Sequence, residues 1–271
     1  MSRPSSARIH PTAIIAPEAV LGEHVEVGAY AIIEGPVTLG SGCVIRPQAC
    51  LYGPLTMGRN NTVFSGAVLG ECPQHLKYNG EPTSLDIGDD NIFREHVTIH
   101  RGTTQSMKTT IGSKNFFMVN SHVAHDCVIG DNCFLTNGCM LGGHCVMEDQ
   151  AILSGNSVVH QYTRIGRLSL LSGVSGTSKD IPPFMIQQGY NSIYGVNVVG
   201  MRRAGMNHEQ IDAIRTAFKV LFRDRMLLSA AIAKLEQDLG AIDAIQELVT
   251  FLRGCTRGIN AMRSRMGQEA A

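Results

Sequence analysis

Residues 123–147 read VAHDCVIGDNCFLTNGCMLGGHCVM, and every sixth residue from Val123 to Met147 is apolar. The same phase runs through most of the chain and gives 25 apolar positions, interrupted only at residues 70–86 and 100–110. The positions are Ile9, Ile15, Leu21, Val27, Ile33, Leu39, Ile45, Leu51, Met57, Val63, Leu69, Ile87, Phe93, Ile99, Ile111, Phe117, Val123, Ile129, Leu135, Leu141, Met147, Leu153, Val159, Ile165 and Leu171.

A period of six fits neither an α-helix nor the alternation of a flat strand. It fits a three-sided coil in which each side takes six residues and small residues, often glycine at the second position of a hexad, permit the corners. Such coils stack as parallel strands about 4.8 Å apart. The pattern resembles the hexapeptide repeat of left-handed parallel β-helix proteins, and the handedness is taken from that resemblance. We therefore expect a mainly β chain with this β-helix over residues 1–189.

The two interruptions preserve the six-residue phase, so they are expected to be loops extruded from corners. The first, at 70–86, is rich in turn-forming residues such as Pro73 and Gly80. Long loops on a rigid scaffold frequently carry function.

The repeat fails near Thr177, and residues 190–271 have helical spacing instead. Asn207 can cap a helix, with Gln210 three residues later. We expect a small C-terminal helical domain, whose second helix runs from Ser229 to about Gly240 and whose third runs from Ile242 to Leu252, before Gly254.

Composition excludes several classes of protein. The formal net charge is zero, which argues against a nucleic-acid-binding protein held by bulk positive charge. No apolar run suggests a signal peptide or a membrane span. The eight cysteines form no CxxC pair, which favours a reducing, cytoplasmic environment.

Four of these cysteines, Cys127, Cys133, Cys139 and Cys145, resemble a metal cluster at first sight. Steps of six, however, place successive members on different sides of the coil. They occupy the fifth hexad position, where alanine and serine also occur, so we expect small buried thiols in place of a zinc site.

Residues 18 apart should stack on one face of the coil. This spacing places His125, Gly143 and Gln161 in one column and Asp126, His144 and Tyr162 in the next. His122 precedes His125 by three residues, and His160 adjoins Gln161. Four of the ten histidines thus gather within about two coils, which is unexpected for solvated surface histidines.

Two chemistries fit this cluster. A neutral imidazole can act as a general base toward an alcohol near pH 7, beside an unobstructed glycine N–H for an oxyanion. Histidines can also hold zinc, as in β-helical carbonic anhydrases. The residues alone leave both open.

Further motifs narrow the choice. HVAHDC, GGH at 142–144, VVHQ at 158–161, IHRGT at 99–103, GEPT at 80–83 and IPPFMIQQG at 181–189 together resemble UDP-N-acetylglucosamine O-acyltransferases, the first enzymes of lipid A biosynthesis. In the tail, AIRTAFKVLFR and TRGI also resemble this family, so the resemblance covers essentially the whole chain.

The resemblance implies that His125 is the general base for the glucosamine 3-hydroxyl, which attacks a 3-hydroxyacyl thioester without a covalent intermediate. The acyl chain would be carried on the phosphopantetheine of acyl carrier protein, with no bound cofactor and no metal. Gly143 N–H would stabilise the oxyanion, and Asp126 would orient His125. Further substrate-binding positions would be Gln74, His75, Lys77, His122, His144, His160, Gln161, Asn197 and Arg203.

Three positions depart from the family pattern. His75 stands where an aspartate is usual, Val199 replaces a glutamate, and Ala204 replaces a basic residue. Gly173 matches a position that limits acyl length, and a glycine there implies a long donor of the hydroxymyristoyl class.

The resemblance also implies a homotrimer with the site between subunits. Acyl carrier protein is acidic, so Arg164 and Arg167 are candidate contacts. Other expectations stay open: a hexapeptide acyltransferase that forms an amide or uses acetyl-CoA, a zinc carbonic anhydrase, and a β-helix without catalytic activity.

Overall fold

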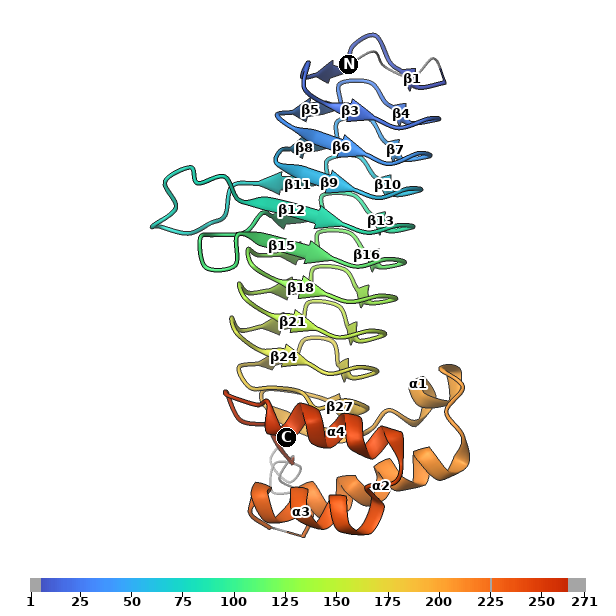
Figure 1. Cartoon of the computed structure of the whole chain (residues 1–271), viewed down its shortest axis with the longest axis vertical. Coiled ribbons are helices and arrows are strands. Elements are labelled where there is room, and N and C mark those ends of the chain that lie inside the picture. The colour runs from blue at the N-terminus through green and yellow to red at the C-terminus, as the bar shows by residue number, and fades with distance from the viewer. Residues whose placement is uncertain (1–5, 225, 263–271) are drawn as a thin grey trace, which may run out of the picture.

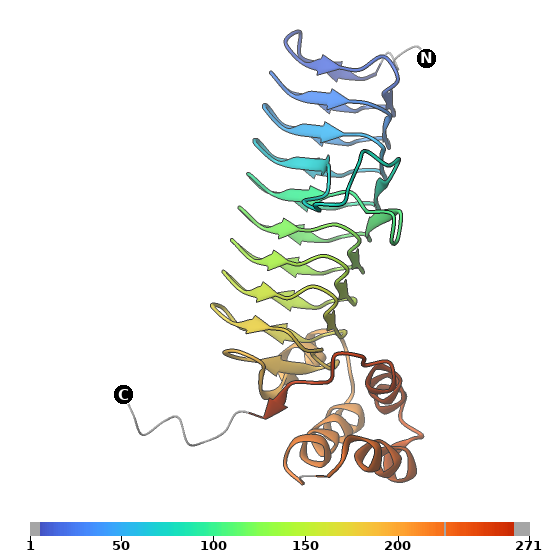
Figure 2. The same cartoon turned by 90° about the vertical axis from the view of Figure 1, so that its left-hand side faces the viewer.

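The computed structural model describes residues 6–224 and 226–262. The chain winds into stacked three-sided coils, and helices cover the end of the stack that holds the last coils (Figures 1 and 2). Successive strands enter three different sheets in turn, which we call A, B and C.

The strands of each sheet are short, and most have two residues. Sheet A contains β1 (Arg8–Ile9), β4 (Glu26–Val27), β7 (Val44–Ile45), β10 (Thr62–Val63), β13 (Ile92–Phe93), β16 (Phe116–Phe117), β19 (Phe134–Leu135), β22 (Ile152–Leu153), β25 (Leu170–Leu171), β27 (Met185–Gln187), β28 (Ser192–Val196) and β29 (Ala261–Met262). Sheet B contains β2 (Ile14–Ile15), β5 (Ile32–Glu34), β8 (Cys50–Tyr52), β11 (Val68–Glu71), β14 (Thr98–His100), β17 (His122–Val123), β20 (Met140–Leu141), β23 (Val158–Val159) and β26 (Gly176–Thr177). Sheet C contains β3 (Val20–Leu21), β6 (Val37–Leu39), β9 (Leu55–Met57), β12 (Ser84–Ile87), β15 (Lys108–Ile111), β18 (Val128–Ile129), β21 (Val146–Met147) and β24 (Arg164–Ile165).

The apolar ladder faces the interior of the coil. Val123 pairs in parallel with Leu141, and Leu141 pairs with Val159, each partner lying one coil further along the chain. Val123 and Leu141 are fully buried, and Val159 is 4% exposed. Stacked burial of one such side chain per hexad supplies the main stabilisation of the coil. The predicted left-handed parallel β-helix of hexapeptide repeats is confirmed.

The corners are made by two positions of each hexad. The fourth residue commonly has a positive φ, as at Asp126 (62°) and His144 (61°). The fifth residue points inward and must be small: Cys127 and Cys145 are fully buried, and each thiol donates to a main-chain carbonyl at 3.2 Å. The prediction of small buried thiols is confirmed.

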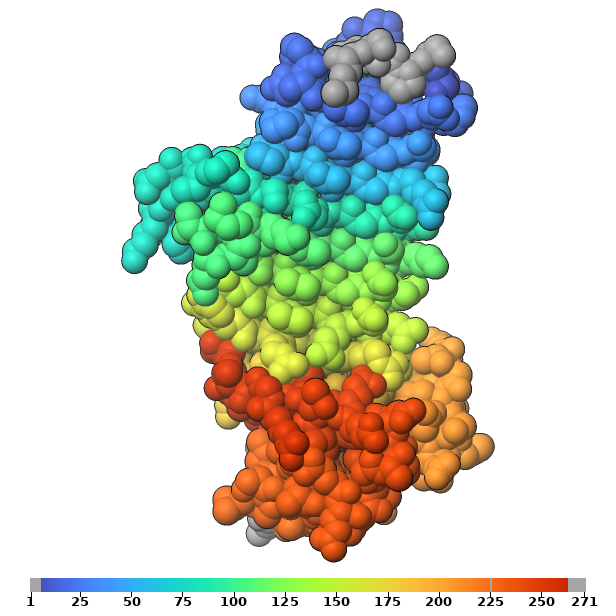
Figure 3. Space-filling view, viewed as in Figure 1, coloured from blue at the N-terminus to red at the C-terminus, as the bar shows by residue number. Residues whose placement is uncertain are grey.

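Both interruptions leave the coil at the same corner, where sheet B turns into sheet C, and project from one side of the molecule (Figure 3). The first loop connects β11 to β12 and comprises residues 72–83, and the second connects β14 to β15 and comprises residues 101–107. The expected ranges 70–86 and 100–110 were therefore too wide, because the flanking strands extend into them.

Within the described residues, the C-terminal part contains four helices, α1 (Val198–Arg203), α2 (His208–Phe222), α3 (Leu228–Leu239) and α4 (Asp243–Arg253). Asn207 and Gln210 form the predicted capping box, and Gly240 and Gly254 cap α3 and α4. Two features were not predicted: helix α1, and the continuation of sheet A through β28 and β29. No helix of the described ranges is long and apolar enough to cross a membrane.

Arg164 and Arg167 hold the helical part against the coil. Arg167 makes two hydrogen bonds of 2.8 Å to the carboxylate of Glu247 on α4. Arg164 donates to the main-chain oxygen of Phe251 at 3.2 Å, and its guanidinium lies 4.1 Å from the ring of the same residue. The structure gives these arginines a docking role within the chain, where contacts to acyl carrier protein were expected.

Candidate active site

The predicted histidine cluster lies at the corner between sheets B and C, beside both loops. His122 belongs to β17, and His125 and Asp126 form the turn that leads to β18. The next coil contributes Gly143 and His144 at the equivalent corner, as the regular repeat spacing predicted.

Asp126 is the most heavily hydrogen-bonded side chain of this corner. Its carboxylate is fully buried and accepts hydrogen bonds from Thr103 N (2.8 Å), Thr103 Oγ1 (2.7 Å) and Ser106 Oγ. Burial alone would raise the pKa of this carboxyl, but the bonds from Ser106, Thr103 and His125 lower the pKa to about 2. Asp126 is therefore a fixed negative charge at neutral pH.

This charge orients His125. Nδ1 of the imidazole lies 2.7 Å from Asp126 Oδ2, and because the carboxylate is ionised, Nδ1 is the donor. Nε2 of the neutral ring then carries the free lone pair. The side chain is 9% exposed, so the imidazole lies in a largely dry setting with one nitrogen available to accept a proton.

Gly143 lies against the ring of His125. A Cβ built on Gly143 would lie 2.7 Å from His125 Cε1 and 3.0 Å from Nε2. Any side chain at this position would therefore press on the His125 ring and force it to shift. The main chain of the next coil consequently approaches Nε2 of His125 more closely than a substituted residue would allow.

Three further rings surround His125. His75, from the first loop, lies edge-on at a centroid distance of 5.3 Å, and His144 lies edge-on at 5.0 Å. Tyr162 stacks parallel on His144 at 4.4 Å, because the two residues occupy the same corner position in consecutive coils. Burial lowers the pKa of His144, although the charge of Asp126 opposes this effect.

A second pair of histidines lies next to the first. His100 and His122 meet edge-on at 5.0 Å, and His122 Nδ1 lies 2.7 Å from Thr98 Oγ1. Burial, and secondarily His122, lowers the pKa of His100 to about 4, and burial also lowers that of His122. Both rings are therefore neutral near pH 7.

Four other expected substrate-binding residues lie along the same edge. Gln74 and Lys77 are exposed in the first loop, and His75 lies between them in the sequence. His160 and Gln161 are exposed one coil beyond Gly143, where His160 Nδ1 lies 3.1 Å from Gln161 O.

Three expected residues lie elsewhere on the chain. Asn197 is buried and caps α1, accepting from Gly200 N at 2.9 Å and donating to Leu168 O at 2.8 Å. With Arg203 it lines a hollow of about 510 Å³ between α1 and sheet A. Gly173 lies at the corner between sheets A and B, in a hollow of about 420 Å³.

The three departures from the family pattern lie at the α1 hollow and in the histidine cluster. Val199 is 58% exposed, and with Ala204 it makes the α1 hollow more apolar than a charged pair would. His75 lies in the histidine cluster itself.

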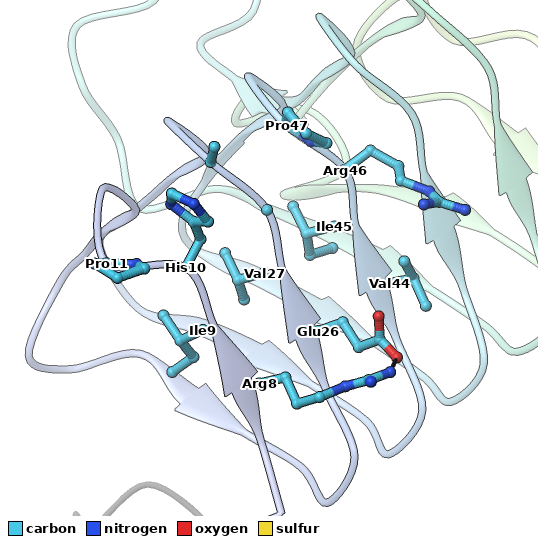
Figure 4. Close-up of a pocket in the computed structure, with 12 residues that line it drawn as sticks. Arg8, Ile9, His10, Pro11, Glu26, Val27, Val44, Ile45, Arg46 and Pro47 are labelled. Atoms are coloured by element: carbon cyan, nitrogen blue, oxygen red, sulfur yellow. Dashed lines mark hydrogen bonds and ion pairs between the residues drawn. The ribbon is translucent and has the colours of Figure 1, made fainter.

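Another hollow, of about 540 Å³, lies on the first coils and is far from these residues (Figure 4). The apolar side chains of Ile9, Val27 and Ile45 stack along it, beside an ion pair between Arg8 and Glu26. That pair is exposed, and the first coils offer no buried imidazole beside a buried carboxylate within the described residues.

The residues that sequence reasoning missed come from the loops and their borders. Thr103, Ser106 and Thr109 hold Asp126, with Thr109 Oγ1 accepting from Asp126 N at 2.8 Å. His100 adds the buried imidazole. The available signal was the IHRGT motif, which begins at a strand end immediately before the second loop.

The donor atoms of His125, Asp126 and His144 lie within 4.8 Å of one another, so these residues form a group that could also hold a metal ion. The oxygens of Asp126, however, are already engaged by hydrogen bonds from Thr103, Ser106 and His125. A metal would have to displace at least one of them.

Comparisons with known proteins extend over the whole fold. Residues 180–260 match a family model described as UDP-N-acetylglucosamine O-acyltransferase, domain 2, and residues 18–53 and 108–143 match the bacterial transferase hexapeptide repeat. Acyl-[acyl-carrier-protein]–UDP-N-acetylglucosamine O-acyltransferase from Herminiimonas arsenicoxydans is 42% identical, over 93% of this chain and 98% of its own length. The protein of the same name from Anaeromyxobacter sp. is 47% identical over 73% of this chain and 78% of its own.

Solved structures agree. LpxA from Acinetobacter baumannii superposes with a TM-score of 0.90 at 39% identity, covering 94% of this chain and 99% of that one. The UDP-N-acetylglucosamine acyltransferase from Bacteroides fragilis gives 0.90 at 38% identity, covering 92% and 98%. Together with the hexapeptide ladder and the histidine corner, this similarity means that the chain belongs to the UDP-N-acetylglucosamine O-acyltransferase family.

Proposed function

We propose that the chain transfers a 3-hydroxyacyl group from acyl carrier protein to the 3-hydroxyl of UDP-N-acetylglucosamine, the first step of lipid A biosynthesis. The observation that carries the proposal is the arrangement of Asp126, His125 and Gly143, which fixes an imidazole with a free Nε2 beside unobstructed main chain. The relatives that bear this activity in their names cover the chain almost completely.

In this mechanism His125 Nε2 takes the proton of the sugar hydroxyl as its oxygen attacks the thioester carbonyl. The N–H of Gly143 stabilises the oxyanion of the tetrahedral intermediate. The C–S bond then breaks, and the imidazolium returns its proton to the phosphopantetheine thiolate. The ionised carboxylate of Asp126 stabilises the imidazolium between the two transfers, because it lies 2.7 Å from Nδ1.

The proposal includes a homotrimer in the cytoplasm. Asn197 and Arg203, which would contact the nucleotide, lie beside sheet A, whereas His125 lies at the corner between sheets B and C. A neighbouring copy would bring these two sets of residues to one substrate. All eight cysteines are free thiols, which suits a reducing compartment.

We further propose a long acyl donor. Gly173 is exposed in its hollow, and a Cβ there would lie 3.3 Å from Gly155 O, so any larger residue would fill that space. Under the proposed function, the departures at His75, Val199 and Ala204 alter the contacts to the sugar and the pyrophosphate.

The test is an acyl-transfer assay with UDP-N-acetylglucosamine and a series of 3-hydroxyacyl carrier proteins. We expect product from the 3-hydroxymyristoyl donor and a lower kcat/KM with short chains. Preference for a short chain would overturn the assignment of a long donor. An amide product would show that the acceptor is an amine, and activity only with acetyl-CoA would show that the donor is not acyl carrier protein.

A second candidate, a zinc carbonic anhydrase, rests on the donor atoms of His125, Asp126 and His144. It predicts stoichiometric zinc in the purified protein and hydration of carbon dioxide. Metal analysis combined with that assay separates it from the acyltransferase.

A further inference from the structure

Arg101 joins the first loop to the body of the β-helix. The half-buried guanidinium donates from Nη1 to the main-chain oxygens of Gly53 (3.0 Å) and Gly70 (3.1 Å). On its other side, Nε and Nη2 donate to the hydroxyl of Tyr78 at 3.2 and 3.0 Å, and Nη2 also lies 3.1 Å from Cys72 Sγ. One side chain thus contacts two coils and the first loop.

The geometry depends on a planar guanidinium. Its rigid fork of five N–H donors can serve carbonyls on one edge and a hydroxyl on the other, whereas a lysine ammonium is a single point of charge. Tyr78 OH donates to Glu81 O at 2.8 Å, so its oxygen is free to accept both bonds from Arg101. The hydroxyl thereby also bonds within the second half of the first loop.

The second loop fixes Arg101 in turn. Thr103, two residues later, is held by the carboxylate of Asp126 through its N–H and its hydroxyl. Between them, a Cβ on Gly102 would lie 2.4 Å from Lys108 N, so the main chain there is packed too closely for a side chain. Contacts therefore run from the orienting carboxylate through the second loop to Arg101 and Tyr78.

Tyr78 lies three residues after His75, whose ring lies edge-on to His125 at 5.3 Å. Leu76, between them, is fully exposed, so apolar packing of that side chain within the chain does not hold the turn. The bonds from Arg101 to Tyr78 therefore restrain this turn on the Tyr78 side, and the buried Pro73 restrains it on the other side.

We propose that Arg101 is a positioning residue for the acceptor: through Tyr78 it holds the first loop, with Gln74, His75 and Lys77, over the His125 corner. The inference rests on the proposed function in so far as those loop residues contact the nucleotide sugar. Arg101 itself stays behind the loop and touches no reacting atom.

The clamp can be tested without any activity. Lys77 is an exposed trypsin site inside the first loop, so cleavage after Lys77, followed by mass spectrometry of native protein, reports loop opening. We expect Arg101→Ala and Tyr78→Phe to accelerate this cleavage by about 5-fold or more, because each removes both Arg101–Tyr78 bonds. Arg59→Ala is the matched control, since Arg59 makes an exposed ion pair with Asp89 and lies outside both loops.

Steady-state kinetics test the positioning role. Freeing the loop should raise KM for UDP-N-acetylglucosamine about 10-fold and change kcat by less than about 3-fold, whereas loss of the base affects kcat. The double variant Arg101→Ala with Tyr78→Phe should be little worse than Arg101→Ala alone, because both changes remove one contact. Arg101→Lys should recover only part of the KM.

The outcomes separate the two proposals. Unchanged cleavage after Lys77 in both Arg101→Ala and Tyr78→Phe would overturn the clamp, whatever the activity. Faster cleavage with unchanged KM would overturn the positioning role. If the wild type does not acylate UDP-N-acetylglucosamine, the proposed function fails, while the cleavage experiment still decides whether Arg101 holds the loop. Arg101→Ala that does not fold leaves Tyr78→Phe to decide.

Discussion

The first coils and the middle coils of the β-helix have the same interior and different corners. Leu51 in the first region and Leu141 in the second are both fully buried, and each pairs with the residue at the equivalent position of a neighbouring coil. At the corner between sheets B and C, however, the first coils carry Gly35 and Gly53, whereas the middle coils carry His125 and Gly143.

The difference shows how this fold separates stability from chemistry. Inward positions are fixed by the need to fill the coil, so they remain Ile, Leu, Val, Met or Phe along its length. Third and fourth hexad positions point away from the interior, so they can hold His125 and Asp126 without disturbing the ladder. Two loops that emerge at the same corner then convert an outer edge into a partly buried site.

Among the variants that test the difference between the two kinds of corner, His125→Ala should have the largest effect on activity. Loss of the proposed general base should lower kcat by about 100-fold or more and leave the far-ultraviolet circular dichroism unchanged. His24→Ala, at an exposed corner of the first region, should retain full activity. Equal activity of wild type and His125→Ala would remove His125 from the mechanism.

Gly143→Ala tests the same corner with a single methyl group. Its Cβ would press on His125 at 2.7 Å, so we expect kcat to fall by roughly 10-fold or more with the fold retained. Gly155→Ala is the matched control: it occupies the equivalent hexad position at another corner, and its Cβ meets nothing closer than 3.6 Å. Comparable losses in both variants would argue against a specific role for Gly143.

A smaller effect concerns pH. Burial lowers the pKa of His100 from 6.5 to about 4, so between these values the unfolded chain binds a proton that the native chain does not. Acidification from about pH 7 to about pH 4.5 therefore destabilises the native state, and His100→Leu should remove on the order of 1 kcal/mol of that loss. Thermal melts of wild type and His100→Leu at both pH values measure it, with His24→Leu as the exposed control. If His100→Leu loses as much stability on acidification as the wild type does, His100 is not the responsible group.

How far the sequence predicts this molecule depends on the distance over which its periodicity holds. The ladder, the capping box at Asn207 and the columns of His125 and His144 follow from fixed spacing. Across the loops the spacing changes: Val68 pairs with Thr98, and Thr98 pairs with His122, so both loop-bearing coils are longer than the regular repeat. A repeat of constant length therefore could not place His100 beside His122, although both residues were visible in the sequence.

The other misses have a similar cause. Arg101 and Thr103 act through hydrogen bonds to main chain and to other loop residues, which leave no periodic trace. Arg164 and Arg167 were expected as contacts to acyl carrier protein, and their bonds to α4 were not predicted because α4 belongs to a part of the chain with no repeat. The strands β28 and β29 extend sheet A by pairing that begins only after the hexads have ended.

The carboxylate of Asp126 has a consequence for how genetic variation at this corner is interpreted. It receives bonds both from the imidazole of His125 and from the two residues that hold the second loop, Thr103 and Ser106. A change at Asp126 is therefore pleiotropic: one codon alters the electrostatics of His125 and the anchoring of the second loop. Its phenotype cannot be divided between the two by single substitutions, whereas Thr103 and His125 can each be changed alone.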